Sequence, residues 1–428
     1  MSIFQIPYHT GSLPLEIHHD TQINVLQSKI NSFQPQRAQS ELIDQALDNP
    51  IGSPDIENLV KGKNNIVIIT SDHTRPLPSR LTLPRLLTRI RSTEPSVDIK
   101  IMIAPGSHRA PSAEELSSKF GQDITQQEQI IVHNAHDRDS LVRLSDLPSG
   151  GELWLNKTAV EADFVIAEGL IEPHFFAGFS GGRKSILPGI AGYQTVLANH
   201  CSELIAHPKA RTGILDGNPV HADMLFAARQ LNPGFILNVV LNHDKEFIAA
   251  VAGDVEKAHL AGCRFLNDLC QVQAAPADIV VSSNNGYPLD QNIYQSVKAM
   301  NTAAATAKPD AVIIVSACCS DGHGGEGFYR SMTKAAGPAD ILQTVLNTPQ
   351  NETVPDQWQF QILARILKKH RVILVTDQCD PRIIREMHID QAFCMNEALQ
   401  KAQEIKGRHA DITIIPDGVG VIVKSGQR

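Results

Sequence analysis

Short apolar runs, each followed by a polar loop and a helical pattern, are the feature that most restricts the fold of this chain. Three such runs stand in the first half, at residues 66–70, 98–104 and 162–167. They are rich in β-branched residues and too short for helices. Strands of this kind are typical of a parallel sheet that helices cover on both faces. The sequence therefore predicts an α/β fold.

The same pattern returns in the second half, where we expect strands at 277–283, 311–316, 372–376 and 411–416 and helices at 291–306 and 357–370. A capping box of Ser112 and Glu115 predicts another helix start. The polar stretch 271–276 has no periodicity and indicates a boundary. Because 428 residues are too many for one core, we predict two α/β domains with mainly parallel sheets. They are an N-terminal cofactor-binding domain, 1–270, and a C-terminal domain, 277–410, with the strand at about 411–428 returning to the first.

Composition and charge exclude several classes of protein. The chain is 42% hydrophobic and 20% charged, which is typical of a globular protein and not of a disordered one. With 38 basic and 46 acidic residues the net charge is −8, so we expect neither nucleic acid nor a membrane surface as a partner. The first ten residues do not form an export signal, and the seven cysteines are scattered without a C-x-x-C pair. We therefore expect a cytoplasmic protein with reduced thiols, in which Cys318 and Cys319 have no assigned role.

Polar clusters follow the first two predicted strands, at the position where ligands bind in open α/β sheets. The first is Asp72, His73, Thr74 and Arg75. Its carboxylate and guanidinium fit either an anion-binding fork or an ion pair that closes the loop, and the pattern leaves both open. The second contains His108, whose ordinary pKa suits proton transfer near neutral pH. One histidine among 17 fits a structural role as well.

The third cluster, 172–185, is the most informative. It contains His174 and three closely spaced glycines, followed by Arg183 and Lys184. The glycines would let backbone N–H groups converge on an anion, and the two cations would supply charge. Arg183 stands where a P-loop requires glycine, which argues against a nucleotide triphosphatase. A lysine in such a loop also fits covalent attachment of a cofactor.

A fourth cluster places Tyr294, Gln295 and Lys298 on one helix face, with Asp290 as the expected N-cap. That face either binds a small carboxylate or is simply exposed to solvent, and the sequence leaves both open. The glycine-rich loop 321–325, with His323, fits either a structural turn or a contact with substrate. His200 ends a helical stretch without neighbouring metal ligands. A metal role for it requires a bound cofactor that supplies the other ligands.

Taken together, these motifs resemble a known family. The runs DHTRP, GSHR, EPHFFAGFSGGRKSILPGI, ANH, PLDQNIYQSVK, DGHGGEGFY and PDQW occur in the order seen in nickel-pincer-dependent lactate racemases and their 2-hydroxyacid racemase and epimerase relatives. The resemblance covers nearly the whole chain, and its third motif is long and specific.

The resemblance implies an isomerase with a nickel cofactor, Ni(II)-pyridinium-3,5-bisthiocarboxylate mononucleotide, bound in an active site in the interdomain cleft. By this resemblance the cofactor is attached covalently at Lys184, nickel is bound by His200, and the cofactor is held by Asp72, His73, Thr74 and Arg75. The implied acid–base pair is His108 and His174, and the implied substrate-binding residues are Arg75, Tyr294, Gln295, Lys298 and Trp358. The implied partners are lactate and, transiently, the proteins that synthesise the cofactor.

Two alternatives remain open from the sequence. One is a racemase or epimerase of another 2-hydroxyacid, such as malate or a sugar acid. A pocket walled by Phe176, Tyr294 and Trp358 favours the small methyl group of lactate over a second carboxylate. The other is a phosphate- or nucleotide-binding protein without redox chemistry, which would leave His108, His174 and His200 without roles.

Overall fold

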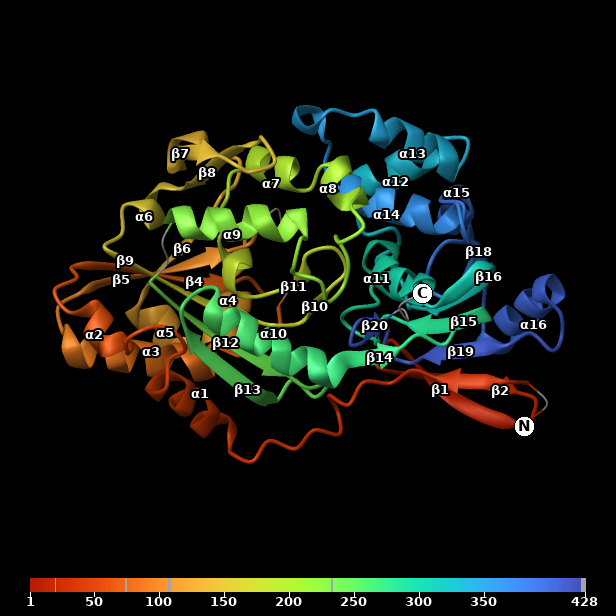
Figure 1. Ribbon diagram of the computed structural model, residues 1–428, viewed down its shortest axis with the longest axis horizontal. Helices are drawn as coiled ribbons and strands as arrows, with labels where there is room; N and C mark the ends of the chain where they lie inside the picture. The colour runs from red at the N-terminus through yellow and green to blue at the C-terminus, as the bar shows by residue number, and fades with distance from the viewer. Residues whose placement is uncertain (20, 74, 107–108, 232–233, 425–428) are drawn as a thin grey trace. The chain divides into compact units, whose positions relative to one another are not determined.

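The chain folds into two compact units, each with its own mainly parallel sheet (Figure 1). The computed structural model describes residues 1–424 except residues 20, 74, 107–108 and 232–233. The Lys184 unit consists of residues 30–199 and 208–269. The His200 unit consists of residues 1–29, 200–207 and the described chain from 270 onward. The α/β class and the mainly parallel sheets that the sequence predicts are thus confirmed.

The Lys184 unit is built on a six-stranded sheet with the order β13-β12-β9-β4-β5-β6. Its strands are β4 (Asn65–Ser71), β5 (Asp98–Ala104), β6 (Gln129–Val132), β9 (Phe164–Leu170), β12 (Phe235–Leu241) and β13 (Phe247–Gly253). All neighbours are parallel except β12 and β13. The central strands β9 and β12 are buried along their whole length, as expected for a sheet covered on both faces.

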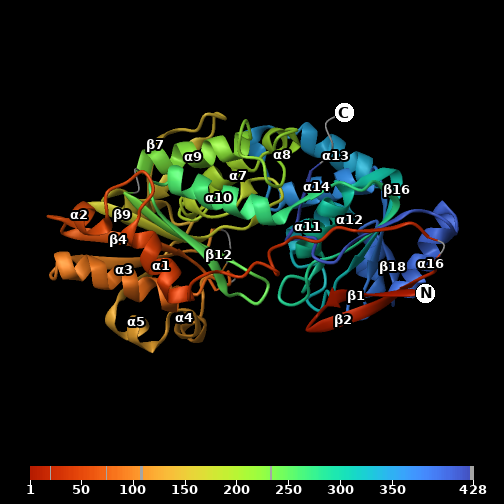
Figure 2. The same cartoon turned by 60° about the horizontal axis from the view of Figure 1, so that its bottom comes forward.

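Helices cover both faces of this sheet (Figures 1 and 2). One face carries α1 (Gln39–Asp48), α2 (Ile56–Val60), α3 (Ser79–Thr93), α4 (Ala113–Phe120) and α5 (Gln122–Gln127), and the other carries α9 (Pro219–Leu231) and α10 (Lys257–Cys270). Shorter elements follow β6 and β9: η1 (Arg138–Ser140), β7 (Leu141–Asp146), β8 (Glu152–Asn156), α6 (Lys157–Val160), β10 (Pro173–His174), β11 (Gly178–Phe179), η2 (Gly182–Ser185) and α7 (Tyr193–Asn199). Apolar residues of α1–α5 and the sheet form one buried core. The capping box that starts α4 at Ser112 is confirmed.

The His200 unit has a second six-stranded sheet, of order β18-β17-β16-β15-β19-β3, in which every pair is parallel. Its strands are β3 (Ile23–Val25), β15 (Ala277–Ser283), β16 (Ala307–Ser316), β17 (Arg371–Val375), β18 (Asp390–Ala392) and β19 (Ile412–Ile415). The helices are α8 (Ser202–Ala206), α11 (Ile293–Ala304), α12 (Glu326–Thr333), α13 (Pro338–Leu346), α14 (Gln357–Leu367), α15 (Pro381–Glu386) and α16 (Met395–Lys406), with η3 at Gln350–Glu352. An antiparallel hairpin, β1 (Ser2–Tyr8) and β2 (Gly11–Ile17), packs on the core of this sheet.

The predicted domain boundaries differ from the two units in three places. The C-terminal segment does not join the Lys184 unit, because β19 pairs with β15 and β3 of the His200 unit, and β20 (Ile422–Lys424) pairs with β14 (Gln271–Gln273). Residues 1–29 also belong to the His200 unit, through β1, β2 and β3, and so do residues 200–207. Each difference arises from parallel pairing or packing between segments far apart in the sequence, which local patterns do not record.

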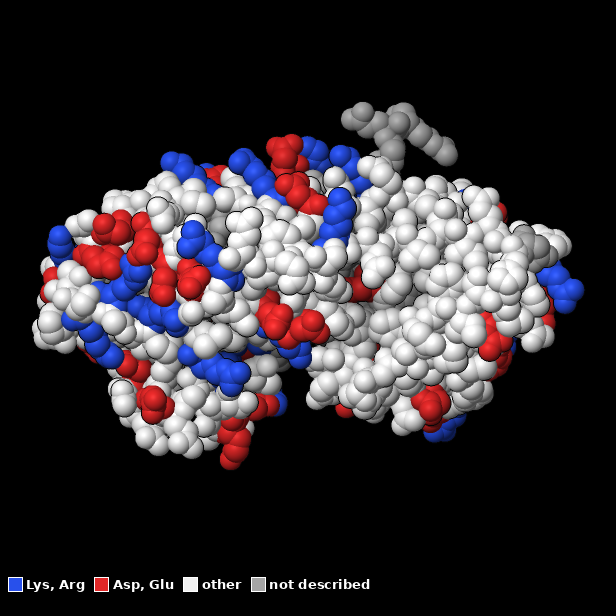
Figure 3. All heavy atoms as spheres, turned by 90° about the horizontal axis from the view of Figure 1, so that it is seen from below, with Lys and Arg blue, Asp and Glu red and all other residues white. Residues whose placement is uncertain are grey.

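The surface carries both signs of charge close together. On the outer side of α1–α3, Arg85 pairs with Asp44 at 3.1 Å and Arg89 with Glu57 at 3.2 Å. Figure 3 shows acidic and basic side chains interspersed on the face that it presents, without a large basic patch.

Within the described residues, every helix is too short or too polar to cross a lipid bilayer.

Candidate active site

The loop after β4 contains the first predicted site residues. Asp72 is buried, with 2% of its surface exposed. His73 Nε2 lies 3.5 Å from a carboxylate oxygen of Glu115, and its Nδ1 is buried without a hydrogen-bond partner in the described part of the chain. Arg75 makes no ion pair with any described residue, and Thr74 lies outside the described residues. The loop therefore holds an imidazole nitrogen without a hydrogen-bond partner and a guanidinium without an ion pair, both judged among the described residues.

The loop after β5 is tied to the first loop by Glu115. Arg109 donates to both carboxylate oxygens of Glu115, at 2.8 and 2.5 Å, and the same carboxylate accepts from the amide of Ser112. These bonds lower the pKa of Glu115 to about 2, with Arg109 the largest cause. His108, the predicted acid–base residue next to Arg109, lies outside the described residues. Sequence reasoning used Glu115 only as a cap and missed that it joins the two loops.

A lysine beneath these loops was also missed. The Nζ of Lys119, on α4, donates to the carbonyl oxygens of Arg75 and Leu77, each at 3.3 Å. Burial lowers the pKa of Lys119 to about 8, although the nearby carboxylates of Glu168 and Asp72 oppose that shift. Glu168 is fully buried on β9 and accepts hydrogen bonds from the hydroxyls of three residues: Thr70, Ser79 and Thr82. A buried polar network thus supports the loop that carries Arg75.

The segment after β9 brings His174 and Lys184 to the same aromatic ring. The imidazole of His174 lies 4.5 Å from the ring centre of Phe176 in a T-shaped contact. The Nζ of Lys184 lies 5.8 Å from the centre of that ring. The amide of Ala177 donates to His174 Nδ1 at 3.3 Å, so the neutral ring carries its proton on Nε2. An amine and an imidazole, both half-buried, therefore stand around one phenyl ring.

The glycines and Arg183 of this segment do not form the expected anion cradle. Arg183 is fully buried, and its guanidinium donates to carbonyls of its own loop. The N–H of Gly182 donates to Asn238 at 2.7 Å. Gly178 has φ of 79°, and a Cβ there would lie 2.3 Å from the carbonyl oxygen of Ile214. The glycines therefore permit close backbone packing, and Arg183, one of the two expected anion-binding cations, is instead bound within its own loop.

The His200 unit holds a second group of predicted residues. His200 is buried, and its ring lies 4.9 Å from that of Trp358. Trp358 Nε1 donates to the hydroxyl of Tyr294 at 3.1 Å, and Tyr294 also hydrogen-bonds to Asp356. Burial raises the pKa of Asp356, and that hydrogen bond partly offsets the rise. Three predicted site residues, His200, Tyr294 and Trp358, are thus in one cluster.

Helix α14 organises this cluster through its buried face. Gln359 donates to the carbonyl of Tyr294, and Gln361 donates to the carbonyl of Ser202 at 2.9 Å. The same helix carries Trp358, so it contacts both α11 and the segment that begins with His200. On α11, Tyr294, Gln295 and Lys298 are half-buried while the residues between them are buried. Helix α11 therefore carries the three predicted residues at partly exposed positions.

The start of α11 differs from the prediction. Asn292, not Asp290, is the N-cap, and its side chain accepts from the amide of Gln295 at 3.0 Å. Asp290 instead accepts from the amides of His9, at 2.7 Å, and Cys318, at 3.0 Å. The first amides of α11 are bound by the 321–325 loop, because Ile293 donates to the carbonyl of Gly322 and Tyr294 to that of His323. These contacts give the loop and Cys318 a structural role.

The described residues contain no group of three or more His, Cys, Asp or Glu side chains that is placed to hold a metal ion. A metal at His200 would therefore take further ligands from a bound cofactor, in agreement with the sequence argument. The unpartnered Nδ1 of His73 and the half-buried amine of Lys184 fit a polar cofactor in the Lys184 unit.

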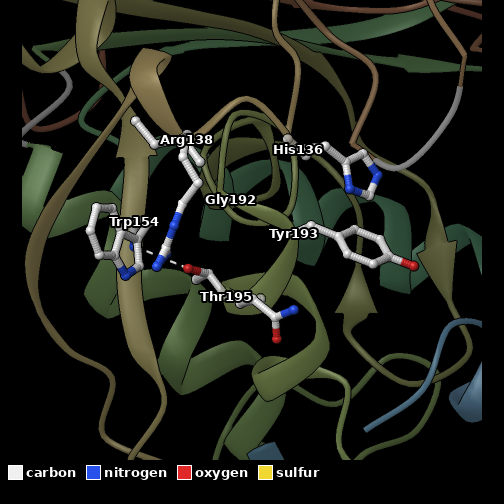
Figure 4. A pocket seen from close by; sticks show the side chains of 9 residues that line it. His136, Arg138, Trp154, Gly192, Tyr193 and Thr195 are labelled. Atoms are coloured by element: carbon white, nitrogen blue, oxygen red, sulfur yellow. Dashed lines mark hydrogen bonds between the residues drawn. The ribbon is translucent and has the colours of Figure 1, made fainter. Parts of the chain in front are cut away.

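A separate cavity of about 310 Å³ lies at the end of β6 in the Lys184 unit (Figure 4). The guanidinium of Arg138 stacks on Trp154 at 4.6 Å, and His136 faces Tyr193 at 4.3 Å. None of the predicted site residues lines this cavity. Its His136 and Trp154 therefore serve as control positions for substitutions of the histidines and the tryptophan of the candidate active site.

Comparison with known proteins agrees with these motifs. Residues 8–213 match the lactate racemase N-terminal domain, and residues 272–423 match the lactate racemase C-terminal domain. A lactate racemase from Thermoanaerobacterium thermosaccharolyticum is 50% identical over 99% of this chain and 100% of its own length. One from Lactiplantibacillus plantarum is 49% identical over the same shares of the two chains.

Solved structures give the same result. The lactate racemase apoprotein from T. thermosaccharolyticum matches with a TM-score of 0.96 and 50% identity, covering 99% of this chain and 100% of that one. A protein from Thermotoga maritima, at 15% identity, has a TM-score of 0.66 over 92% of this chain and 99% of its own, and shares the fold. Full-length identity at this level, together with both domain matches, shows that this chain is an isomerase of the lactate racemase family.

Proposed function

We propose that this chain interconverts L- and D-lactate. The observation that carries the proposal is the 50% identity, over essentially the full length of both chains, with a lactate racemase. Two features of the structure support it. Lys184 and His174 stand around Phe176, and His200, Trp358 and Tyr294 form one cluster. The proposal assigns both groups of residues to one reaction.

We propose further that the reaction uses the nickel-pincer nucleotide that the sequence motifs imply. Lys184 would hold it covalently, His200 would bind its nickel, and the loop with Asp72, His73 and Arg75 would hold its polar groups. An imidazole such as that of His200 is a suitable nickel ligand, and the cofactor would supply the others. When bound, this group would supply a hydride acceptor next to the substrate. Its remaining polar contacts would satisfy the buried Nδ1 of His73.

The chemistry of lactate explains why an acceptor of this kind is needed. The α-hydrogen is a very poor acid beside a carboxylate, so removing it as a proton would cost much more than removing it with its electron pair. Loss of the hydroxyl proton and the α-hydride leaves planar pyruvate, which has lost the configuration of lactate. Return of the hydride to either face then gives either enantiomer.

The residues of this chain would handle the proton and the carboxylate. We assign the hydroxyl proton of one enantiomer to His174 and that of the other to His108, since racemisation needs a proton acceptor for each. Arg75, Gln295 and Lys298 would bind the carboxylate and the carbonyl oxygen. Phe176, Tyr294 and Trp358 would surround the methyl group. An arginine–carboxylate contact of this kind contributes about 1.5–3 kcal/mol.

The experiment is a substrate panel on enzyme produced together with the cofactor-synthesis proteins. We expect racemisation of lactate, measured by chiral chromatography, and little or no conversion of malate or sugar acids. We also expect a nucleotide-sized mass addition on the peptide that contains Lys184, and loss of both activity and addition in Lys184→Met. Faster conversion of malate than of lactate would overturn the substrate assignment. An active enzyme with an unmodified Lys184 peptide would overturn the cofactor assignment.

A further inference from the structure

Arg183 is a fully buried cation that has no carboxylate partner among the described residues. Its guanidinium is satisfied by neutral acceptors alone. Nε donates to His221 Nδ1 at 3.0 Å, and Nη1 lies 3.1 Å from His259 Nε2. The remaining acceptors are three backbone carbonyls, of Ala177 at 2.8 Å, Ser180 at 3.3 Å and Gly181 at 3.2 Å. A buried charge without a counterion is costly, so its retention calls for an explanation.

The three carbonyls belong to the loop that carries the proposed reactive groups. Ala177 is bound on both sides, because its carbonyl accepts from Arg183 and its amide donates to His174 Nδ1. The loop ends at Lys184, whose amide donates to the carbonyl of Gly181 at 3.1 Å, another acceptor of Arg183. One side chain therefore fixes the backbone next to His174 and next to Lys184.

The two histidines next to the Arg183 guanidinium, His221 and His259, stay uncharged near pH 7. Burial, with Arg183 as the next cause, lowers the pKa of His221 to about 3 and lowers the pKa of His259 well below its usual value. Both rings are thus neutral near pH 7. His221 Nδ1 accepts from the guanidinium, and His259 Nε2 lies 2.8 Å from the carbonyl oxygen of Ser180, which also accepts from Arg183. Burial also raises the pKa of the neighbouring Cys263 thiol to about 12, so no anion forms beside Arg183.

We propose that Arg183 is a positioning residue that holds the 177–184 loop from within the fold and thereby sets the places of His174 and Lys184. The planar fork of arginine can reach acceptors on both sides of the loop at once. A lysine offers its donors from a single atom and cannot span His221 and Ala177. The inference rests on the proposed function for the roles of His174 and Lys184, but the geometry that it describes can be measured without any activity.

The test compares Arg183→Lys and Arg183→Met with Arg229→Met. Arg229 also lowers the pKa of His221, but it is exposed and pairs with Glu256, so it is a matched control. We expect hydrogen exchange of the 174–184 peptides to become about tenfold faster or more in both Arg183 variants, with β4 and β12 unchanged. On chain produced without cofactor, acylation of Lys184 should become faster by a similar factor. Arg229→Met should match the wild type in both measurements.

Loaded enzyme adds a kinetic readout, in which kcat should fall about tenfold or more in Arg183→Lys while KM changes little, since substrate binding is assigned elsewhere. A folded Arg183 variant with wild-type exchange and wild-type Lys184 acylation would overturn the proposal. If neither variant folds, hydrogen exchange is measured on the wild-type chain instead. The proposal expects amides 177–184 to exchange as slowly as those of β9, and fast exchange of these amides would overturn it. A wild-type chain that does not racemise lactate would instead overturn the proposed function and leave these exchange results valid.

Discussion

The indole ring of Trp358 packs against the imidazole of His200, with ring centres 4.9 Å apart and planes at 66°. The same indole donates from Nε1 to the hydroxyl of Tyr294 at 3.1 Å. Trp358 therefore restrains the orientation of the proposed nickel ligand and fixes the hydroxyl that would face the substrate.

Replacing Trp358 separates these two effects. Trp358→Phe keeps an aromatic ring beside His200 but removes the hydrogen bond, so kcat/KM should fall about tenfold while the nickel content per chain stays unchanged. Trp358→Ala should lower the nickel content as well, measured by elemental analysis of purified enzyme. Trp154→Phe, in the Lys184 unit, is the control and should resemble the wild type. Full activity in Trp358→Phe would show that the Tyr294 contact is unimportant.

His174 should behave as a proton-transfer residue with a defined tautomer. Because Ala177 donates to Nδ1, nitrogen NMR of the free enzyme should show the neutral ring protonated on Nε2. His174→Gln should lower the rate of lactate racemisation about a hundredfold or more, as expected for loss of general acid–base catalysis. His136→Gln, in the cavity of Figure 4, should leave the rate unchanged. Near-normal racemisation by His174→Gln would rule out this role.

We expect Lys119 to make the affinity for lactate depend on pH. Its pKa is lowered to about 8, so above that pH the amine loses its charge and its hold on the carbonyls of Arg75 and Leu77 weakens. KM for lactate should therefore rise between about pH 8 and 9 in the wild type, and Lys119→Arg, which stays charged, should delay this rise. Lys119→Met should raise KM about tenfold already at pH 7. Lys100→Met, at another lysine of the same unit, is the control, and an unchanged KM in Lys119→Met would contradict the assignment.

Stability should fall as the pH is lowered from 6.5. The pKa of half-buried His221 is about 3 in the folded chain and near 6.5 when unfolded, so only the unfolded state binds a proton between these values. Its contribution to the free energy of unfolding is therefore complete above pH 6.5 and is lost progressively toward pH 3. The slope is at most ~1.4 kcal/mol per pH unit for one such group. His221→Asn, which keeps an acceptor for Arg183, should have a Tm that depends less on pH between 5 and 7, whereas His243→Gln should keep the wild-type dependence.

Much of the fold follows from local patterns. The strands expected at 98–104 and 277–283 have those bounds, and α14 begins at the predicted Gln357. The two strands are largely buried apolar runs, and α14 is a largely buried helix, so in these elements local sequence and tertiary packing agree. The pairing of β3 with β19 depends on contacts between residues nearly 400 positions apart, as in Asn24 with Thr413, and no local signal records it.

The candidate site shows the same division. The sequence motifs selected candidate residues, and the structure groups Lys184 with His174, and His200 with Trp358 and Tyr294. It placed Arg183 wrongly, because an arginine beside glycines at a strand end is ordinarily an anion ligand. Only the packing of α9 and α10 brings His221 and His259 within hydrogen-bond distance of its guanidinium.

The most direct test of the central claim follows the α-hydrogen of lactate during turnover. Fully loaded enzyme is incubated with L-lactate in D2O until the two enantiomers are equal, and the deuterium at Cα is measured by proton NMR and mass spectrometry. Transfer of the hydrogen as a hydride that returns within the site predicts racemic lactate that keeps its original α-hydrogen. Racemic lactate carrying solvent deuterium at Cα would contradict the account and indicate proton abstraction at carbon.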